Sequence, residues 1–245
     1  MHLYLRQAHE TVFPPKDNPH GPLPPILLLW TIVTGLVDAY SYLELSRVFV
    51  ANMTGNVVFL GFSLAGAPGF LWWASVLAIL AFMVGANLGG RIQRGNSGQH
   101  RAAHLAAGAA TQMALVIVAV IVALLLPPAD HILGLVILVV ILSVAMGLQN
   151  STARALGVPD LTTTVLTLTI TGLAGDGSAQ EGKKNNVGRR ILSIFCMALG
   201  AFIGGLLVQA EKGAYTLIVA ALLIAVIVWR AAHHRENAAS WTNPK

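Results

Sequence analysis

The chain has 245 residues, of which 56% are hydrophobic and only 10% are charged, with a mean hydropathy of +0.71. Soluble domains carry about 25% charged residues, and a water-soluble fold of this length could not bury so much apolar surface. We therefore expect an all-α integral membrane protein surrounded by the lipid bilayer. The net charge of +5 does not indicate a nucleic-acid partner, because the basic residues gather at the ends of apolar segments.

Two polar tails flank two apolar halves. Residues 1–24 contain Glu10, Lys16, Asp17 and several prolines, and we expect a short flexible N-terminal tail in the cytoplasm. Residues 25–126 form the first membrane repeat, 131–230 form the second, and 231–245 form a cytoplasmic C-terminal tail. Pro127 and Pro128 separate the two halves.

Eight apolar segments follow one another along the chain. The first half contains segments 26–43, 48–65, 70–90 and 102–126, and the second contains 131–152, 161–173, 191–209 and 214–229. A spanning helix needs about 20 apolar residues. Segments 48–65 and 161–173 fall short of that length, so we expect them to enter the membrane and return on the same side.

The second half repeats short motifs of the first. A Gly-Ala-x-x-Gly-Gly pattern begins at Gly85 and again at Gly200. Residues 35–38 (Gly-Leu-Val-Asp) match 147–150 (Gly-Leu-Gln-Asn), and 53–56 (Met-Thr-Gly-Asn) match 166–169 (Leu-Thr-Leu-Thr). Three weak matches in the same order and at similar spacing indicate an internal duplication.

The distribution of positive charge supports six spans. When segments 48–65 and 161–173 re-enter, every Lys and Arg except Arg47 and Lys212 falls on one side. The positive-inside rule assigns that side to the cytoplasm, so both termini would be cytoplasmic in a multi-pass protein of the bacterial inner membrane. We predict six transmembrane helices plus two re-entrant or broken segments, arranged as two inverted three-span repeats, as in many secondary transporters.

The two short segments carry the candidate binding residues. Val48 to Val50 favours an extended chain, Asn52 or Thr54 suits a helix start, and Gly55 permits close approach of backbone. The start of such a half-helix exposes N–H groups that attract anionic or polar ligands. The threonines of 161–173 either line a polar path or pack between helices. The predicted substrate-binding residues are Asn52, Thr54, Gly55, Asn56, Gln149, Asn150, Thr163, Thr164 and Thr167.

Asp38 is a carboxylate inside the first spanning segment. An intramembrane carboxylate is costly and points to function. It could take a proton, coordinate a coupling cation, pair with Arg47, or cap structure near the outer headgroups. The matching region of the second half holds only the neutral Gln149 and Asn150, which fits a single coupling ion.

Other polar and small residues have more than one interpretation. Asn87, Thr111 and Gln112 either complete a cavity or bond between helices. Gly85, Gly89, Gly200 and Gly204 permit close helix crossing, which we expect inside the chain, with a homodimer face as the alternative. His100 and His104 lack a third ligand nearby, so we expect a solvated helix end and no metal. The sequence contains no motif for catalysis or for a cofactor, so we do not expect an enzyme.

Several of these stretches resemble one family. Residues 38–40, 49–56, 147–150 and 158–167 are similar to the YoaK family of bacterial membrane proteins, and Val-Ala-Asn-Met-Thr-Gly-Asn at 50–56 is the most specific string. The resemblance covers roughly Pro25 to Arg230 and implies a polytopic inner-membrane protein without naming a substrate. In the family pattern a glycine follows the threonine that corresponds to Thr167, but this chain has Leu168 there. This difference weakens the expectation that the backbone at this position approaches a ligand directly.

The leading functional hypothesis is a secondary transporter for a small polar or anionic solute. The half-helices would contact the solute, Asp38 would couple a proton or a cation, and one repeat would rock against the other. A passive channel or facilitator is the first alternative. A scaffold or sensor subunit without a substrate is another, and a membrane enzyme acting on a lipid would need paired carboxylates or a histidine cluster that the sequence does not contain.

Overall fold

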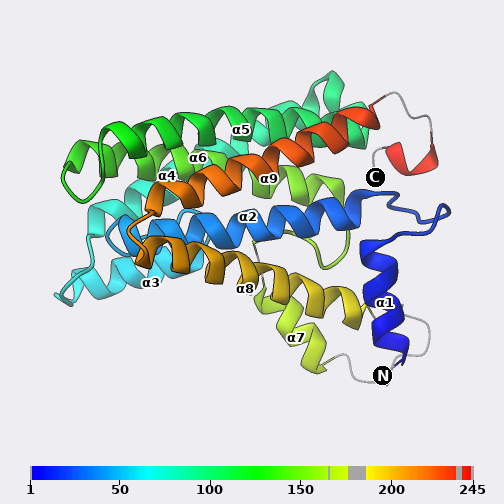
Figure 1. Cartoon of the computed structure of the whole chain (residues 1–245), viewed down its shortest axis with the longest axis horizontal. Coiled ribbons are helices and arrows are strands. Elements are labelled where there is room, and N and C mark those ends of the chain that lie inside the picture. Colours follow the sequence, from blue (N-terminus) through cyan, green and yellow to red (C-terminus); the bar gives the residue numbers. More distant parts are fainter. Residues whose placement is uncertain (1, 165, 176–185, 236–238, 244–245) are drawn as a thin grey trace.

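A computed structural model describes the whole chain except residues 1, 165, 176–185, 236–238 and 244–245 (Figure 1). All regular structure among the described residues is helical. Lys183, Lys184 and Lys245, which belong to the predicted cytoplasmic charge, lie outside the described residues. The helices in chain order are α1 (His2–Val12), α2 (Leu23–Glu44), α3 (Met53–Leu64), α4 (Trp72–Arg94), η1 (Asn96–Gln99), α5 (Arg101–Leu125), α6 (Ile132–Leu156), α7 (Thr167–Gly175), α8 (Val187–Gln209), α9 (Gly213–His233) and η2 (Ser240–Thr242).

Six of these helices are long and apolar enough to cross a membrane: α2, α4, α5, α6, α8 and α9. Each has at least 21 residues, and a rise of about 1.5 Å per residue makes such a helix roughly 30 Å long. With 12 and 9 residues, α3 and α7 reach only roughly 18 and 14 Å and cannot cross. The predicted all-α class and the six spans are confirmed.

The first expectation that the structure corrects is the flexible N-terminal tail. Residues His2–Val12 form α1, which lies across the first turn of α8 (Figure 1). Gly188 makes the close contact, because a Cβ there would lie 2.5 Å from the carbonyl oxygen of Tyr4. The backbone N–H of Gly188 also donates to Oε1 of Gln7 at 3.1 Å. Prolines and charges were weak grounds for predicting disorder, because the prolines follow this helix.

Both chain termini lie at the same end of the bundle (Figure 1), and Arg101 connects them. The buried Arg101 guanidinium donates to the carbonyl oxygens of Trp241 and Leu156, and it lies 3.3 Å from Nδ1 of His20. Gly21 adopts a φ of +50°, and its backbone packs directly against the Trp241 ring. The segments before α2 and after α9 are therefore fixed to the end of α6.

The helices pair across the two halves of the chain. From the first half, α2 packs along α8 and α4 along α6, while α5 packs against α9 and α6. Residues of α2 and α6 are the most buried of the six spans. These two helices therefore lie at the centre, each held by a helix from the other half.

Glycines allow the two tightest crossings. A Cβ on Gly200 would lie 2.1 Å from the carbonyl oxygen of Ile32, and a Cβ on Gly35 would lie 2.3 Å from that of Met197. At the other crossing, a Cβ on Gly85 would lie 2.0 Å from the Val144 carbonyl oxygen, and one on Gly147 would lie 2.1 Å from that of Phe82. Only glycine permits backbones to come this close.

Candidate functional site

The chain between α2 and α3 is extended and is tied to α2 by Asp38. Ser46 and Arg47 have φ values of 58° and 59°, which turn the chain back toward the bundle. Oδ1 of Asp38 then accepts the backbone N–H of Ala51 at 2.9 Å. Asp38 lies six residues before the end of α2, so this bond lies roughly 9 Å inside the span. The first half-helix, α3, therefore begins within the membrane-embedded part of the bundle.

Asn56 closes the start of α3. Its Oδ1 accepts the backbone N–H of Phe49 at 3.0 Å, and its Nδ2 donates to the Phe49 carbonyl at 2.6 Å. Asn52 is the N-cap, with Oδ1 accepting the N–H of Gly55 at 3.3 Å. Because non-helical backbone at membrane depth must find partners inside the protein, these amides supply them.

The second half contains a matching arrangement. Gly157 ends α6 in the left-handed conformation, and Asp160 and Thr163 also have positive φ values of 62° and 66°. Nε2 of Gln149, in α6, donates to the Thr163 hydroxyl at 3.1 Å. Gln149 lies seven residues before the end of α6, so the returning chain reaches roughly 10 Å into the span before α7 begins.

Gln149 is also the centre of a buried polar network between the spans. It accepts a hydrogen bond of 2.6 Å from Nε2 of Gln112 in α5, and its own Nε2 lies 2.8 Å from the Thr34 hydroxyl in α2. The indole N–H of Trp30 donates to Oε1 of Gln112 at 2.5 Å. All four side chains are fully buried. The network joins α2, α5, α6 and the chain leading into α7.

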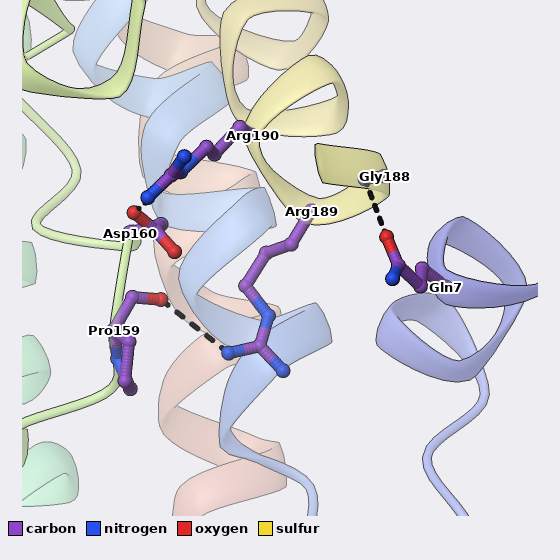
Figure 2. A network of polar contacts seen from close by, with 6 residues as sticks. All are labelled: Gln7, Pro159, Asp160, Gly188, Arg189 and Arg190. Atoms are coloured by element: carbon purple, nitrogen blue, oxygen red, sulfur yellow. Dashed lines mark hydrogen bonds and ion pairs between the residues drawn. The ribbon is translucent and has the colours of Figure 1, made fainter. Parts of the chain in front are cut away.

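Arginines of α8 hold the same lead-in chain from outside (Figure 2). Nε of Arg190 lies 2.9 Å from Oδ1 of Asp160, and both side chains are largely buried. Arg189 donates to the Pro159 carbonyl at 3.4 Å. Figure 2 also shows Gln7 of α1 contacting Gly188 one residue earlier, so the lead-in to α7 and the N-terminal helix share one anchor.

The predicted binding residues fall into two groups. Asn56, Gln149 and Thr163 are buried and hydrogen-bonded within the fold. Asn52, Thr54 and Thr167 are exposed, whereas Gly55, Asn150 and Thr164 are half-buried. The hydroxyl oxygen of Thr164 is buried and has no hydrogen-bond partner among the described residues. The structure does not gather the nine residues around one cavity.

An open pocket of about 480 Å³ lies elsewhere, where α4 and α6 end. It is lined by Gln93, Ser151, Arg154, Ala155 and Gly157. Toward the bundle centre it meets the tight contact between Gly89 and Ser151, where a Cβ on the glycine would lie 1.9 Å from the serine hydroxyl. The pocket therefore faces one end of the bundle and does not reach the half-helices.

The structure excludes one alternative for Asp38 and corrects one expectation for the histidines. Arg47 does not pair with Asp38; its guanidinium lies over the Phe70 ring, 5.7 Å from the centroid, and against Gly69. His100 caps α5 by accepting the Ala103 N–H at 3.3 Å, but His104 is buried rather than solvated, because α5 begins within the packed end of the bundle. The described residues contain no group of three His, Cys, Asp or Glu that could hold a metal ion.

Sequence reasoning missed several residues of the polar network. Trp30 and Thr34 lie in an apolar run that gives no sign of a polar network. For Gln112 the sequence does not distinguish a cavity-lining role from a hydrogen bond between helices. A helical spacing of four between Trp30 and Thr34 places both on one face, which was the available signal. Arg190 was counted only as a cytoplasmic charge, yet it holds Asp160.

Six apolar spans, two half-helices that begin inside the bundle and a buried amide network define a multi-pass membrane protein with re-entrant segments. The family model described as "Protein of unknown function (DUF1275)" matches residues 26–229. The chain therefore belongs to the DUF1275 family. It is also 29% identical over 202 residues to the UPF0700 transmembrane protein YoaK of Bacillus subtilis (strain 168), covering 79% of this chain and 86% of that protein. No solved structure matches. The predicted YoaK-like family is thus confirmed.

Proposed function

We propose that the protein is a secondary transporter of a small polar or anionic solute in the bacterial inner membrane, with both termini in the cytoplasm. The observation that carries this proposal is the pair of half-helices that begin inside the bundle, one tied to Asp38 and the other to Gln149. In many secondary transporters, discontinuous helices from the two repeats form the solute site near the middle of the bilayer. Thr54 and Thr167 on these half-helices are the solute contacts that we propose.

The proposal includes two inverted repeats. The α2–α8 crossing at Gly35 and Gly200 corresponds, position by position in the repeat, to the α6–α4 crossing at Gly147 and Gly85. A second match supports the same relation: the Gly204 position faces the Leu36 carbonyl and Ala39, while Gly89 faces the Leu148 carbonyl and Ser151. Equivalent contacts in both halves are what an inverted duplication produces.

The glycine crossings favour particular moving units. Because α2 is packed on α8 and α4 on α6, rocking one repeat against the other would break both of the closest backbone contacts. We propose instead that α2 moves with α8 and α4 with α6, so that each rigid unit contains helices from both halves. Interfaces that pack this closely tend to have discrete arrangements rather than continuous deformation.

Asp38 is the proposed coupling residue, and its bond to Ala51 also gives it a structural task. An Asp38→Asn substitution keeps an oxygen acceptor for the Ala51 N–H but cannot carry a charge. We expect this variant to fold normally and to lose gradient-driven uptake. Asp38→Ala, which removes the acceptor, should also lower stability.

The test is flux of a metabolite panel into proteoliposomes, with and without a proton or sodium gradient. Uphill accumulation by the wild type that Asp38→Asn abolishes supports coupled transport. Downhill flux in both the wild type and Asp38→Asn would favour a passive facilitator. In that case the bond between Asp38 and Ala51 would be the whole role of Asp38. Absence of flux for every solute would contradict both and favour a scaffold or sensor subunit.

A further inference from the structure

The N-terminal helix α1 has two distinct faces. Gln7 and Ala8 contact the first turn of α8, and Thr11 is buried on the same side. Leu5, His9, Val12 and Phe13 are all exposed, with 62% of Leu5 and 66% of Phe13 accessible. Their spacing of four, seven and eight residues from Leu5 places them on one helical face. Helix α1 and Phe13, whose N–H still bonds to the His9 carbonyl, thus present three large apolar side chains outward.

The orientation of α1 differs from that of the spans. It runs across α2 and α8 instead of along them, at the end of the bundle where both termini lie (Figure 1). Gln7 attaches it to the first turn of α8, so α1 lies across the end of a candidate membrane span.

We propose that α1 is an interfacial helix, and that the face formed by Leu5, His9, Val12 and the adjoining Phe13 rests on the lipid surface beside the bundle. Amphipathic helices with Leu and Phe on one face lie in the plane of the interface and bury that face among the headgroups and upper acyl chains. The phenyl ring of Phe13 and the ring of His9 lie 5.2 Å apart and form a contiguous patch.

The charges around α1 do not favour one sign of lipid charge. Nε of Arg6 lies 2.7 Å from Oε1 of Glu10, and the exposed Lys16 is followed directly by the exposed Asp17. The nearby Arg189 donates to the Pro159 carbonyl. The exposed apolar side chains and their place beside a membrane span therefore carry the proposal.

Lipid contact at α1 would reach the second half-helix through a short path. Gln7 holds Gly188, the next two residues of α8 hold Pro159 and Asp160, and these begin the chain that leads into α7 (Figure 2). The position of α1 on the bilayer therefore fixes the lead-in to α7 relative to the membrane surface.

The experiment uses the full chain in vesicles of phosphatidylethanolamine and phosphatidylglycerol. Cys196, the single cysteine, is replaced by alanine, and an environment-sensitive fluorophore is attached at Leu5→Cys or Phe13→Cys. Asp17→Cys, exposed in the turn after the helix, is the matched control. Brominated acyl chains quench from within the bilayer, and iodide on both sides of the vesicle membrane quenches from water.

We expect labels at Leu5 and Phe13 to be quenched by the brominated lipid several-fold more than the Asp17 label, and to be shielded from iodide. Quenching by iodide as strong as at Asp17 would overturn the proposal. Shielding from both quenchers would also overturn it, because the face would then be covered by protein, such as a second copy of the chain.

A second variant gives an independent readout. Replacing both Leu5 and Phe13 by Asp removes the apolar face without touching the contact of Gln7 with Gly188. We expect trypsin cleavage after Arg6 to become several-fold faster in this variant than in the wild type, with unchanged thermal stability. Equal cleavage rates would show that the membrane does not protect α1.

Discussion

Nε2 of Gln112 donates to Oε1 of Gln149 across 2.6 Å, and this hydrogen bond links α5 to α6 through two fully buried side chains. The same two amides reach Trp30, Thr34 and Thr163, so the position of the lead-in to α7 depends on them. A buried network of this kind is costly when one member is lost, because the remaining members cannot turn to water.

We predict that Gln149→Leu lowers the free energy of unfolding by about 1–3 kcal/mol, since it leaves buried partners unsatisfied. Combining it with Gln112→Leu should cost less than the two single changes together, because the residues share one contact. Unfolding of the purified protein by a denaturing detergent provides the measurement. Thr111→Ala is the control, because its exposed hydroxyl bonds only to Ala107 of its own helix; strict additivity of the double variant would contradict the prediction.

The helix crossings give a second prediction. Gly85→Ala and Gly200→Ala each place a Cβ within 2.1 Å of a facing carbonyl oxygen, so the helices must separate. We expect a loss of about 1–3 kcal/mol from each, as for other overpacked sites. Gly205→Ala, one position beyond Gly204 in the same helix, meets no atom within 4 Å and should be neutral or slightly stabilising. Thermal unfolding in detergent compares the three, and equal melting temperatures would refute the crossings.

The ion pair between Asp160 and Arg190 is the subject of a third prediction. Replacing Arg190 by Met removes a charge-assisted hydrogen bond and should cost about 1.5–3 kcal/mol. Asp160→Asn should cost less, since asparagine tolerates the left-handed backbone at this position and keeps an oxygen acceptor. The exposed pair of Arg6 and Glu10 is the control, and Glu10→Gln should leave the melting temperature unchanged. A similar effect of Arg190→Met and Glu10→Gln would argue against an anchoring role.

Arg101 gives a fourth prediction. We expect Arg101→Lys to loosen the C-terminal segment and the end of α6, because an ammonium cannot serve the Trp241 and Leu156 carbonyls in the fixed geometry of a guanidinium. Amide hydrogen exchange should become faster at Thr242, whose N–H bonds to Ala239, and at Gly157, whose N–H bonds to Arg154. Arg94→Lys, at the exposed end of α4, should change neither amide. Unaltered exchange in Arg101→Lys would exclude this role.

The spans could be predicted from the sequence because lipid imposes a simple rule: about 20 apolar residues or no crossing. The same rule, with the charge asymmetry of Arg47 and Lys212, separated the short segments that became α3 and α7. Asn52 was also predictable as a cap, since caps are local features. Features that depend on a single helix and the solvent around it, such as its length and its cap, can be inferred from one sequence.

Contacts between distant elements could not be inferred in this way. The double hydrogen bond of Asn56 to Phe49 shows the limit, because the sequence shows an asparagine inside an apolar segment but not which backbone groups its amide bonds. Gln112 was no more conspicuous than Thr111, one residue earlier, until the opposite helix brought Gln149 to it. The N-terminal helix escaped prediction because its partner, Gly188, lies almost at the other end of the chain.

The crossing of Gly35 with Gly200 bears on how the protein is made. α2 leaves the ribosome first among the spans, while α8 emerges only when most of the chain has been synthesised. During translation α2 therefore waits in the membrane with its closest packing surface uncovered and Asp38 in need of the segment that follows. A nascent chain that stops before α8 can already pack α4 along α6, but it leaves Gly35 of α2 without its partner, so the α2–α8 crossing is among the last contacts to form during synthesis.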